Sequence, residues 1–306
     1  MNRSFLYYLL ISFGVCWLGA ALIPLLDVGY GSFASTLIVA LICMPAPAFA
    51  GWLVQTRILK RPFSELGLTW KLANRSQLYL LPIWLFLLLI FNFVWIALLG
   101  NAFGIEAFGT VDFSMDGFLL KLEEMTQGKT DLSEINFPST YVIFLLVAMS
   151  GVVAGATVNL PFTLGEEIGW RGFLFKQLEN QSWLKRSLIT GIIWGLWHTP
   201  LILMGHNYPE HPYLGVLMMV FFCVSLSFPM DWVRRKTNSI LGPGAIHGMI
   251  NASAAGTFLF IQDGDSLMGS IAGFSGALAC LTVFGAQYLV TKIIKEKESI
   301  AVHLPE

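Results

Sequence analysis

Two adjacent glutamates and an arginine stand at the end of a strongly apolar stretch, in the segment Gly165 to Phe173 (Gly-Glu-Glu-Ile-Gly-Trp-Arg-Gly-Phe). Ionisable groups are costly in such a setting and usually have a function. On an α-helix, Glu167 and Arg171 are four residues apart and can form an ion pair, whereas Glu166 points about 100° away. The sequence therefore predicts a paired Glu167 and a Glu166 without a partner.

Further polar residues lie inside later apolar stretches. His198 follows Trp194 by one helical turn, and we expect it about ten residues, or about 15 Å, into its helix. Trp194 can wall the site and shield it from lipid. His247 and Asn251 are also one turn apart, so they share a helix face. Given the topology below, we expect these groups to meet Glu166 in the cytoplasmic half of the bundle.

These residue types can activate a water molecule. An unpaired carboxylate in an apolar setting suits a general base, and a histidine beside it can hold and help deprotonate the same water. A second histidine and an amide can donate hydrogen bonds to the oxyanion of a tetrahedral intermediate. The set predicts peptide hydrolysis without a covalent intermediate.

The composition indicates a membrane protein. Of the 306 residues, 56% are hydrophobic and 12% are charged, and the mean hydropathy is positive. A soluble domain of this length is far less apolar. The formal net charge of −1 gives no indication of a nucleic-acid partner. The four cysteines lie in apolar segments without metal-ligand spacing, and we expect buried hydrophobic residues: Cys16, Cys43, Cys223 and Cys280.

Apolar segments long enough to cross a bilayer, about 20 residues each, number about eight. They fall near residues 5–26, 34–54, 78–100, 139–164, 188–204, 214–230, 240–260 and 270–291. All of the 18 Lys and Arg residues except Lys121 and Lys129 then lie on one side. By the positive-inside rule, both termini are predicted to be cytoplasmic. The predicted fold class is all-α, a polytopic membrane helical bundle of about eight transmembrane helices in contact with the lipid bilayer.

Three parts follow from this arrangement. Residues 1–138 hold the first three helices and an acidic exterior loop, residues 139–291 a catalytic core of five helices, and residues 292–306 a cytoplasmic tail. Within the exterior loop, an amphipathic run predicts a short helix that covers the bundle. Prolines interrupt several spans, as is tolerated where helices line a hydrated chamber: Pro45, Pro47, Pro161, Pro200 and Pro243.

Three motifs occur in a characteristic order: Glu-Glu-x-x-x-Arg at 166–171, aromatic-x-x-x-His at 194–198 and His-x-x-x-Asn at 247–251. They resemble the motifs of the CPBP intramembrane endopeptidases. That family includes type II CAAX prenyl proteases, bacteriocin-processing or self-immunity proteins and lysostaphin-resistance proteins. The resemblance covers about residues 139–256, and Gly-Trp-Arg-Gly-Phe-Leu and Trp-His-Thr-Pro-Leu are similar to the bacterial members.

The resemblance implies a role for each matching residue. Glu166 and His198 would activate the hydrolytic water, and His247 and Asn251 would form the oxyanion site. Glu167 and Arg171 would support the first motif, while Trp194 takes a position where the motif often shows Phe. The family also implies a membrane-associated peptide or protein substrate, no cofactor, and an integral protein of the bacterial cytoplasmic membrane.

Three other functions fit parts of the pattern. Two His and one Glu are a known catalytic zinc set, but there is no His-Glu-x-x-His helix, and Asn251 suits an oxyanion better than zinc. A non-catalytic immunity or scaffold protein of the same family would keep its effect in Glu166→Ala and His198→Ala variants. A transporter would relay protons through membrane Glu and His residues, but we find no paired halves with matching breaks.

Overall fold

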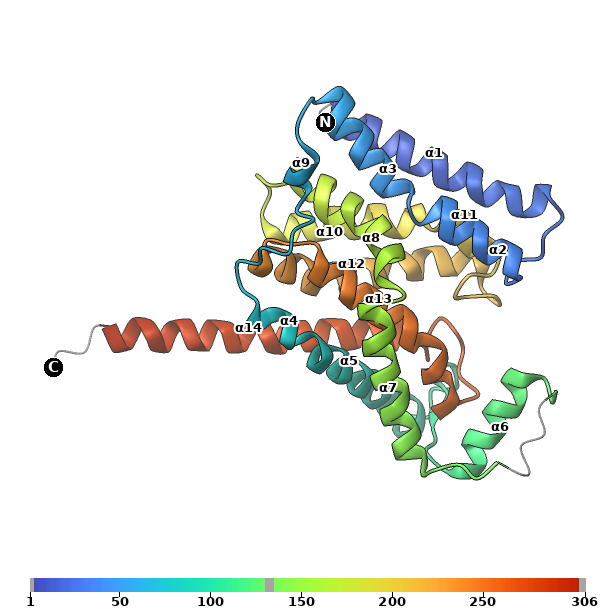
Figure 1. Cartoon of the computed structure of the whole chain (residues 1–306). Coiled ribbons are helices and arrows are strands. Elements are labelled where there is room, and N and C mark those ends of the chain that lie inside the picture. Colours follow the sequence, from blue (N-terminus) through green and yellow to red (C-terminus); the bar gives the residue numbers. More distant parts are fainter. Residues whose placement is uncertain (1–2, 130–134, 303–306) are drawn as a thin grey trace.

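The structure is a computed structural model that describes residues 3–129 and 135–302, with residue 77 and residues 293–302 described by their backbone alone. Figure 1 shows a bundle of helices and a C-terminal helix that extends well beyond the others. The all-α prediction is confirmed, and the described residues add one pair of two-residue strands.

Three helical segments form the N-terminal part of the bundle. The first is α1 (Arg3–Leu25). The second consists of α2 (Phe33–Ile38), the π-helical turn η1 (Val39–Cys43), α3 (Ala46–Leu53) and the π-helical turn η2 (Val54–Ile58). The third follows η3 (Phe63–Leu66) and α4 (Ser76–Tyr79), and consists of α5 (Leu81–Ile96) with η4 (Ala97–Ala102).

A small cover follows the third segment. It contains η5 (Glu106–Phe108), strand β1 (Thr110–Val111) and the expected amphipathic helix, α6 (Met115–Thr126). The buried Phe118 of α6 stacks on Phe260, with ring centroids 6.4 Å apart. Residues 130–134 of the predicted exterior loop lie outside the described residues.

The remaining helices form the core around the motif residues. They are α7 (Thr140–Ala156), α8 (Leu160–Glu167), the π-helical η6 (Ile168–Leu174), α9 (Phe175–Gln177), α10 (Trp183–Trp197), α11 (Thr199–Leu203), α12 (Pro212–Thr237), α13 (Leu241–Thr257) and η7 (Phe258–Phe260). Strand β2 (Ile261–Gln262) pairs antiparallel with β1, and α14 (Phe274–Val302) ends the fold. The predicted tail from residue 292 thus continues a helix up to Val302, and residues 303–306 lie outside the described residues.

Several helices have the length and composition of membrane spans. Within the described residues, five pass this test: Arg3–Leu25, Phe33–Ile58, Leu81–Ala102, Pro212–Thr237 and Phe274–Lys292. A sixth candidate is Thr140–Ala156 with Leu160–Gln177, a pair bent by 60°. The predicted fifth and seventh spans correspond to α10 with α11 and to α13, whose lengths are 15, 5 and 17 residues. The count of about eight crossings and the side of the termini stay predictions.

Breaks in two helices occur next to motif residues. The bend between α7 and α8 immediately precedes Pro161, five residues before Glu166. Helix α10 ends at Trp197 with His198 as its C-cap, and Pro200 lies in the first turn of α11. Pro243, in contrast, lies in the first turn of α13, which runs on without interruption, so the predicted break there is wrong. The two observed helix breaks allow the backbone near Glu166 and His198 to line a cavity.

Two glycines bring α10 unusually close to α12. A Cβ atom on Gly191 would lie 2.4 Å from the Cα atom of Val224, and one on Gly195 would lie 2.4 Å from that of Val220. Small residues four positions apart permit this backbone approach between membrane helices. The contact fixes the last turns of α10, which carry Trp194 and His198.

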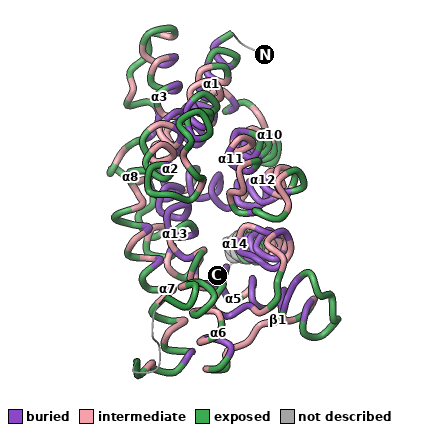
Figure 2. Tube along the Cα trace, turned by 90° about the vertical axis from the view of Figure 1, so that its right-hand side faces the viewer, coloured by how far each residue is buried: buried purple, intermediate pink, exposed green. Residues whose placement is uncertain are grey.

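The distribution of burial fits a bundle surrounded by lipid. Figure 2 shows buried residues on the sides of the helices that face one another and exposed residues on the outer sides. The outer faces remain apolar, as at Leu18 (73% exposed) and Leu217 (67% exposed). All four cysteines are buried and free, as predicted. Several long apolar helices with such faces are those of an integral membrane protein.

Candidate active site

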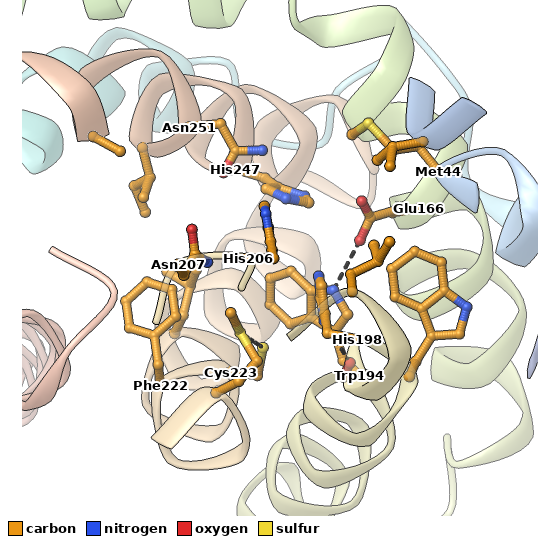
Figure 3. Close-up of a pocket in the computed structure, with 17 residues that line it drawn as sticks. Met44, Glu166, Trp194, His198, His206, Asn207, Phe222, Cys223, His247 and Asn251 are labelled. Atoms are coloured by element: carbon orange, nitrogen blue, oxygen red, sulfur yellow. Dashed lines mark hydrogen bonds between the residues drawn. The ribbon is translucent and has the colours of Figure 1, made fainter. Parts of the chain in front are cut away.

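Five of the predicted site residues line one cavity. It has a volume of about 260 Å³ and is bordered by Glu166, Trp194, His198, His247 and Asn251 (Figure 3). They come from α8, α10 and α13. The other two predicted residues, Glu167 and Arg171, are buried beneath it. The structure therefore gathers the three sequence motifs at one place.

Glu167 and Arg171 form the predicted ion pair. Arg171 Nη1 lies 3.2 and 3.1 Å from the two carboxylate oxygens of Glu167, and both side chains are at most 2% exposed. Arg171 Nη2 also donates to Ser227 Oγ at 2.8 Å. The backbone after Glu167 is π-helical rather than α-helical, which corrects the geometry assumed from sequence. A buried carboxylate held this way has its charge compensated within the protein.

Glu166 has a partner, contrary to prediction. The indole Nε1 of Trp194 donates to Glu166 Oε2 at 2.8 Å (Figure 3), and Glu166 is 3% exposed. Trp194 is therefore more than a wall, since an N–H donor to a carboxylate forms a strong, charge-assisted hydrogen bond. Glu166 also borders the cavity, so its carboxylate can be reached by a water molecule there.

The Trp194 ring lies close to three other residues of the site. Its centroid lies 5.1 Å from that of His247 and 6.1 Å from that of His198. The guanidinium carbon of Arg171 lies over the ring, 4.6 Å from its centroid, which is a cation–π distance. Sequence reasoning assigned Trp194 only a shielding role, because ring contacts across helices leave no trace in residue spacing.

The hydrogen bond of His198 selects its tautomer. Nδ1 lies 2.9 Å from the carbonyl oxygen of Trp194. A carbonyl can only accept, so Nδ1 carries the proton, and Nε2 of the neutral ring is left as an acceptor. Fifteen residues of α10, about 22 Å of helix, precede His198, and its depth of about 15 Å in the membrane stays a prediction.

His247 is tied to the buried ion pair. Its Nδ1 lies 3.1 Å from Glu167 Oε1 and donates to it. His247 can therefore donate a second hydrogen bond through Nε2 only as an imidazolium. Asn251, one turn further along α13, is exposed to the cavity. Among the described residues it has no recorded hydrogen bond, so its amide is open to a ligand or water.

Two cavity residues, His206 and Asn207, were missed by sequence reasoning. They belong to the segment 204–211, between α11 and α12. The His206 ring is parallel to that of His198, with an interplanar angle of 5° and centroids 6.4 Å apart. The only signal in the sequence was the presence of a histidine eight residues after His198, which by itself favours no site.

Tyr30, from the segment that joins α1 and α2, holds His206. Its hydroxyl lies 2.6 Å from His206 Nδ1. Burial raises the pKa of Tyr30 well above its ordinary value, so Tyr30 keeps its proton and can donate. Burial lowers the pKa of His206 to about 4, so the ring is neutral near pH 7. With Nδ1 accepting from Tyr30, the His206 proton lies on Nε2.

A metal centre would need several of these donors to converge. Among the described side chains of residues 3–129 and 135–292, no group of three or more His, Cys, Asp or Glu is placed to hold a metal ion. The recorded contacts of Glu166, His198 and His247 are instead hydrogen bonds within the protein.

Comparison with known proteins relates part of the chain to a protein family. Residues 136–253 match the profile of the family described as type II CAAX prenyl endopeptidase Rce1-like. A stretch of 44 residues, 14% of the chain, is 48% identical to the CAAX prenyl protease 2 of Methanococcus maripaludis. That match spans only 16% of the archaeal protein's length. The profile match contains every residue of the three motifs.

Proposed function

We propose that the chain, whose residues 136–253 match the type II CAAX prenyl endopeptidase Rce1-like family, is an intramembrane endopeptidase. In this proposal Glu166 and His198 activate the water. One observation carries the proposal. His198 presents an unprotonated Nε2 because its Nδ1 donates to the Trp194 carbonyl. It borders the same cavity as Glu166. A water between two such acceptors can lose a proton to one of them as it attacks a carbonyl carbon.

Charge balance supports this division of roles. The buried cluster contains two carboxylates, Glu166 and Glu167, and one fixed cation, Arg171. It is neutral when it holds one additional proton, and an uncompensated charge in an apolar interior is costly. If that proton is on His247, Glu166 is ionised and free to act as the base. The imidazolium of His247 then points a donor, Nε2, toward the cavity.

We assign stabilisation of the oxyanion to residues on the side of the substrate carbonyl opposite the attacking water. His247, as an imidazolium, and the amide of Asn251 are the proposed donors. His206 is a further candidate, since its Nε2–H is set by the bond from Tyr30. Preorganised donors of this kind contribute about 3–4 kcal/mol each to transition-state stabilisation.

The proposed substrate is a membrane-associated peptide or protein. The rest of the cavity lining is largely apolar, with Met219, Phe222 and Leu226 of α12. Such a lining accommodates an apolar segment, prenylated or not. We place the protein in a bacterial cytoplasmic membrane and Glu166 in its cytoplasmic half, following the predicted topology. The end of the cavity at Asn207 then faces the exterior side.

Protein termini in membranes test the activity directly. Cells expressing wild type, Glu166→Gln or the control Glu106→Gln, at matched folded amounts, are compared for new amino- and carboxyl-terminal fragments. Glu106 is exposed and far from the three motifs in the sequence. We expect fragments with wild type and the control but not with Glu166→Gln, since a missing general base costs about 10²–10⁴-fold in rate.

Two outcomes would count against the proposal. Identical fragment sets in all three strains, together with an unchanged biological effect, would favour a non-catalytic immunity or scaffold role. Cleavage that stops after chelation and resumes with zinc would replace the metal-free mechanism by a zinc-dependent one.

A further inference from the structure

A second cavity lies at the other end of helix α12. It has a volume of about 220 Å³, and its lining includes Trp183, Trp232, Arg235, Lys236, Tyr288 and Lys292. These residues stand at the start of α10, in the last turns of α12 and near the end of the apolar part of α14. Arg235 is nine residues beyond Leu226 of the first cavity, about 14 Å along α12. The second cavity is therefore separate from the candidate active site.

Its lining has an excess of positive charge. The carboxylate of Asp231 accepts a hydrogen bond from Arg235 Nε at 2.8 Å. It also accepts two hydrogen bonds from Arg186. One carboxylate thus faces two guanidinium groups, and Lys236 of the lining adds a further cation. The described lining contains no carboxylate, so an anion in the cavity would lie next to Arg235 and Lys236.

Aromatic rings surround these cations. The Trp183 ring lies 6.0 Å from the Tyr288 ring. Lys236 Nζ lies 5.7 Å from the Trp232 ring, and the Arg235 guanidinium lies 6.0 Å from the Trp183 ring. Trp, Tyr, Lys and Arg together are typical of the membrane–water interface. The cavity is therefore at the depth of lipid headgroups, on the basic and predicted cytoplasmic side.

We propose that this second cavity binds the phosphate group of an anionic phospholipid from the surrounding leaflet. Basic pockets between membrane helices on the cytoplasmic side suit such headgroups. Arg235 makes one recorded hydrogen bond among the described residues, through Nε. Its two terminal nitrogens remain available as a fork for phosphate oxygens. The acyl chains would lie along the apolar faces of α12 and α14, which extend side by side beside the cavity (Figure 1).

Native mass spectrometry of the full chain tests the site. The protein in detergent is titrated with phosphatidylglycerol or with phosphatidylcholine of the same acyl chains. The variant Arg235→Gln/Lys236→Gln is compared with Arg57→Gln/Arg61→Gln. The control removes the same charge at the same predicted face, and Arg57 also lies near a tryptophan, 5.8 Å from the Trp52 ring. Arg186 still pairs with Asp231 in the test variant, so the fold is retained.

We expect wild type and control to bind phosphatidylglycerol more tightly than phosphatidylcholine. The test variant should bind phosphatidylglycerol about 25-fold more weakly, at roughly fivefold per cation near a headgroup. An equal loss in the control variant would mean general surface attraction and would overturn the proposal. Displacement of phosphatidylglycerol by inorganic phosphate alone would assign the cavity to a soluble anion and would overturn the lipid assignment.

Discussion

The two walls of the candidate active-site cavity differ in how they use hydrogen bonds. On the first wall, Glu166 borders the cavity and Glu167 and Arg171 are buried behind it, and each of the three has a polar partner inside the protein. On the second wall, Asn251 and Asn207 are exposed to the cavity. No hydrogen bond of either is recorded among the described residues. We call these the paired wall and the open wall.

This difference predicts which residues are needed for folding and which for catalysis. Groups on the paired wall hold charge in an apolar interior, so their loss leaves a buried charge or donor uncompensated. Groups on the open wall keep donors and acceptors available to water and substrate, and their loss leaves nothing unpaired. His198 belongs to both, since Nδ1 is bound to a carbonyl and Nε2 is available. Substitutions on the first wall should therefore affect folding, and those on the second mainly chemistry.

The largest effect is expected from Arg171→Met. It leaves the buried carboxylate of Glu167 without its cation and should lower the free energy of unfolding by about 3–5 kcal/mol, as measured by denaturant unfolding in detergent. The control Lys176→Met breaks an exposed pair with Glu179, 4.0 Å apart, and should cost less than about 1 kcal/mol. Equal losses in the two variants would remove the distinction between the walls.

Trp194→Phe tests a single bond on the paired wall. Phenylalanine keeps an aromatic ring against Arg171 and His247 but cannot donate to Glu166. We expect a loss of about 1.5–3 kcal/mol in unfolding free energy, the range for a hydrogen bond to a charged group.

Trp197→Phe is the matched control for Trp194→Phe. Trp197 is equally buried, at 1% exposed against 2%, and its indole donates to the carbonyl of Ser12 at 3.3 Å, a neutral acceptor. Its loss should be nearer 0.5–1.5 kcal/mol, about what a neutral bond contributes. A control as costly as Trp194→Phe would mean that ring volume, not the bond to Glu166, decides the effect.

Sequence spacing predicted the paired wall better than the open wall. Glu167 and Arg171 are neighbours in sequence, so a helix of either α or π geometry brings them together. The positions of apolar segments similarly predicted most helices, because length and hydropathy are local properties. The partner of Glu166 could not be found this way, since Trp194 reaches it from another helix, 28 positions along the chain.

Other parts of the cavity depend even more on distant contacts. His206 enters the cavity because Tyr30, 176 positions away, binds its ring. The close approach of α10 to α12 depends on Gly191 and Gly195, and its consequence for the site appears only once the helix pairing is known. Glycine spacing alone does not tell which helix is the neighbour.

His206→Gln should have a smaller, pH-dependent effect. The pKa of His206 is lowered from 6.5 to about 4 by burial. Between these values the unfolded chain binds a proton that the folded chain does not, so stability falls as pH decreases from 6.5 to 4. The partly exposed ring should contribute on the order of 1 kcal/mol to this fall. Thermal unfolding of wild type and His206→Gln should converge toward pH 4, and curves that stay parallel from pH 7 to 4 would contradict the assignment.

Asn251→Ala should have the smallest effect on folding stability. It therefore tests most directly whether residues of the open wall act in the chemistry alone. No partner within the described residues loses a hydrogen bond, so the unfolding free energy should change by less than about 0.5 kcal/mol. Hydrolysis should nevertheless fall by about 10²–10³-fold if the amide donates to the oxyanion. Asn251→Asp has the same shape but no N–H and carries a charge that repels an oxyanion, so its rate should be at least as low. Full activity in Asn251→Ala would remove this residue from the proposed oxyanion site and leave His247 and His206 as the candidate donors.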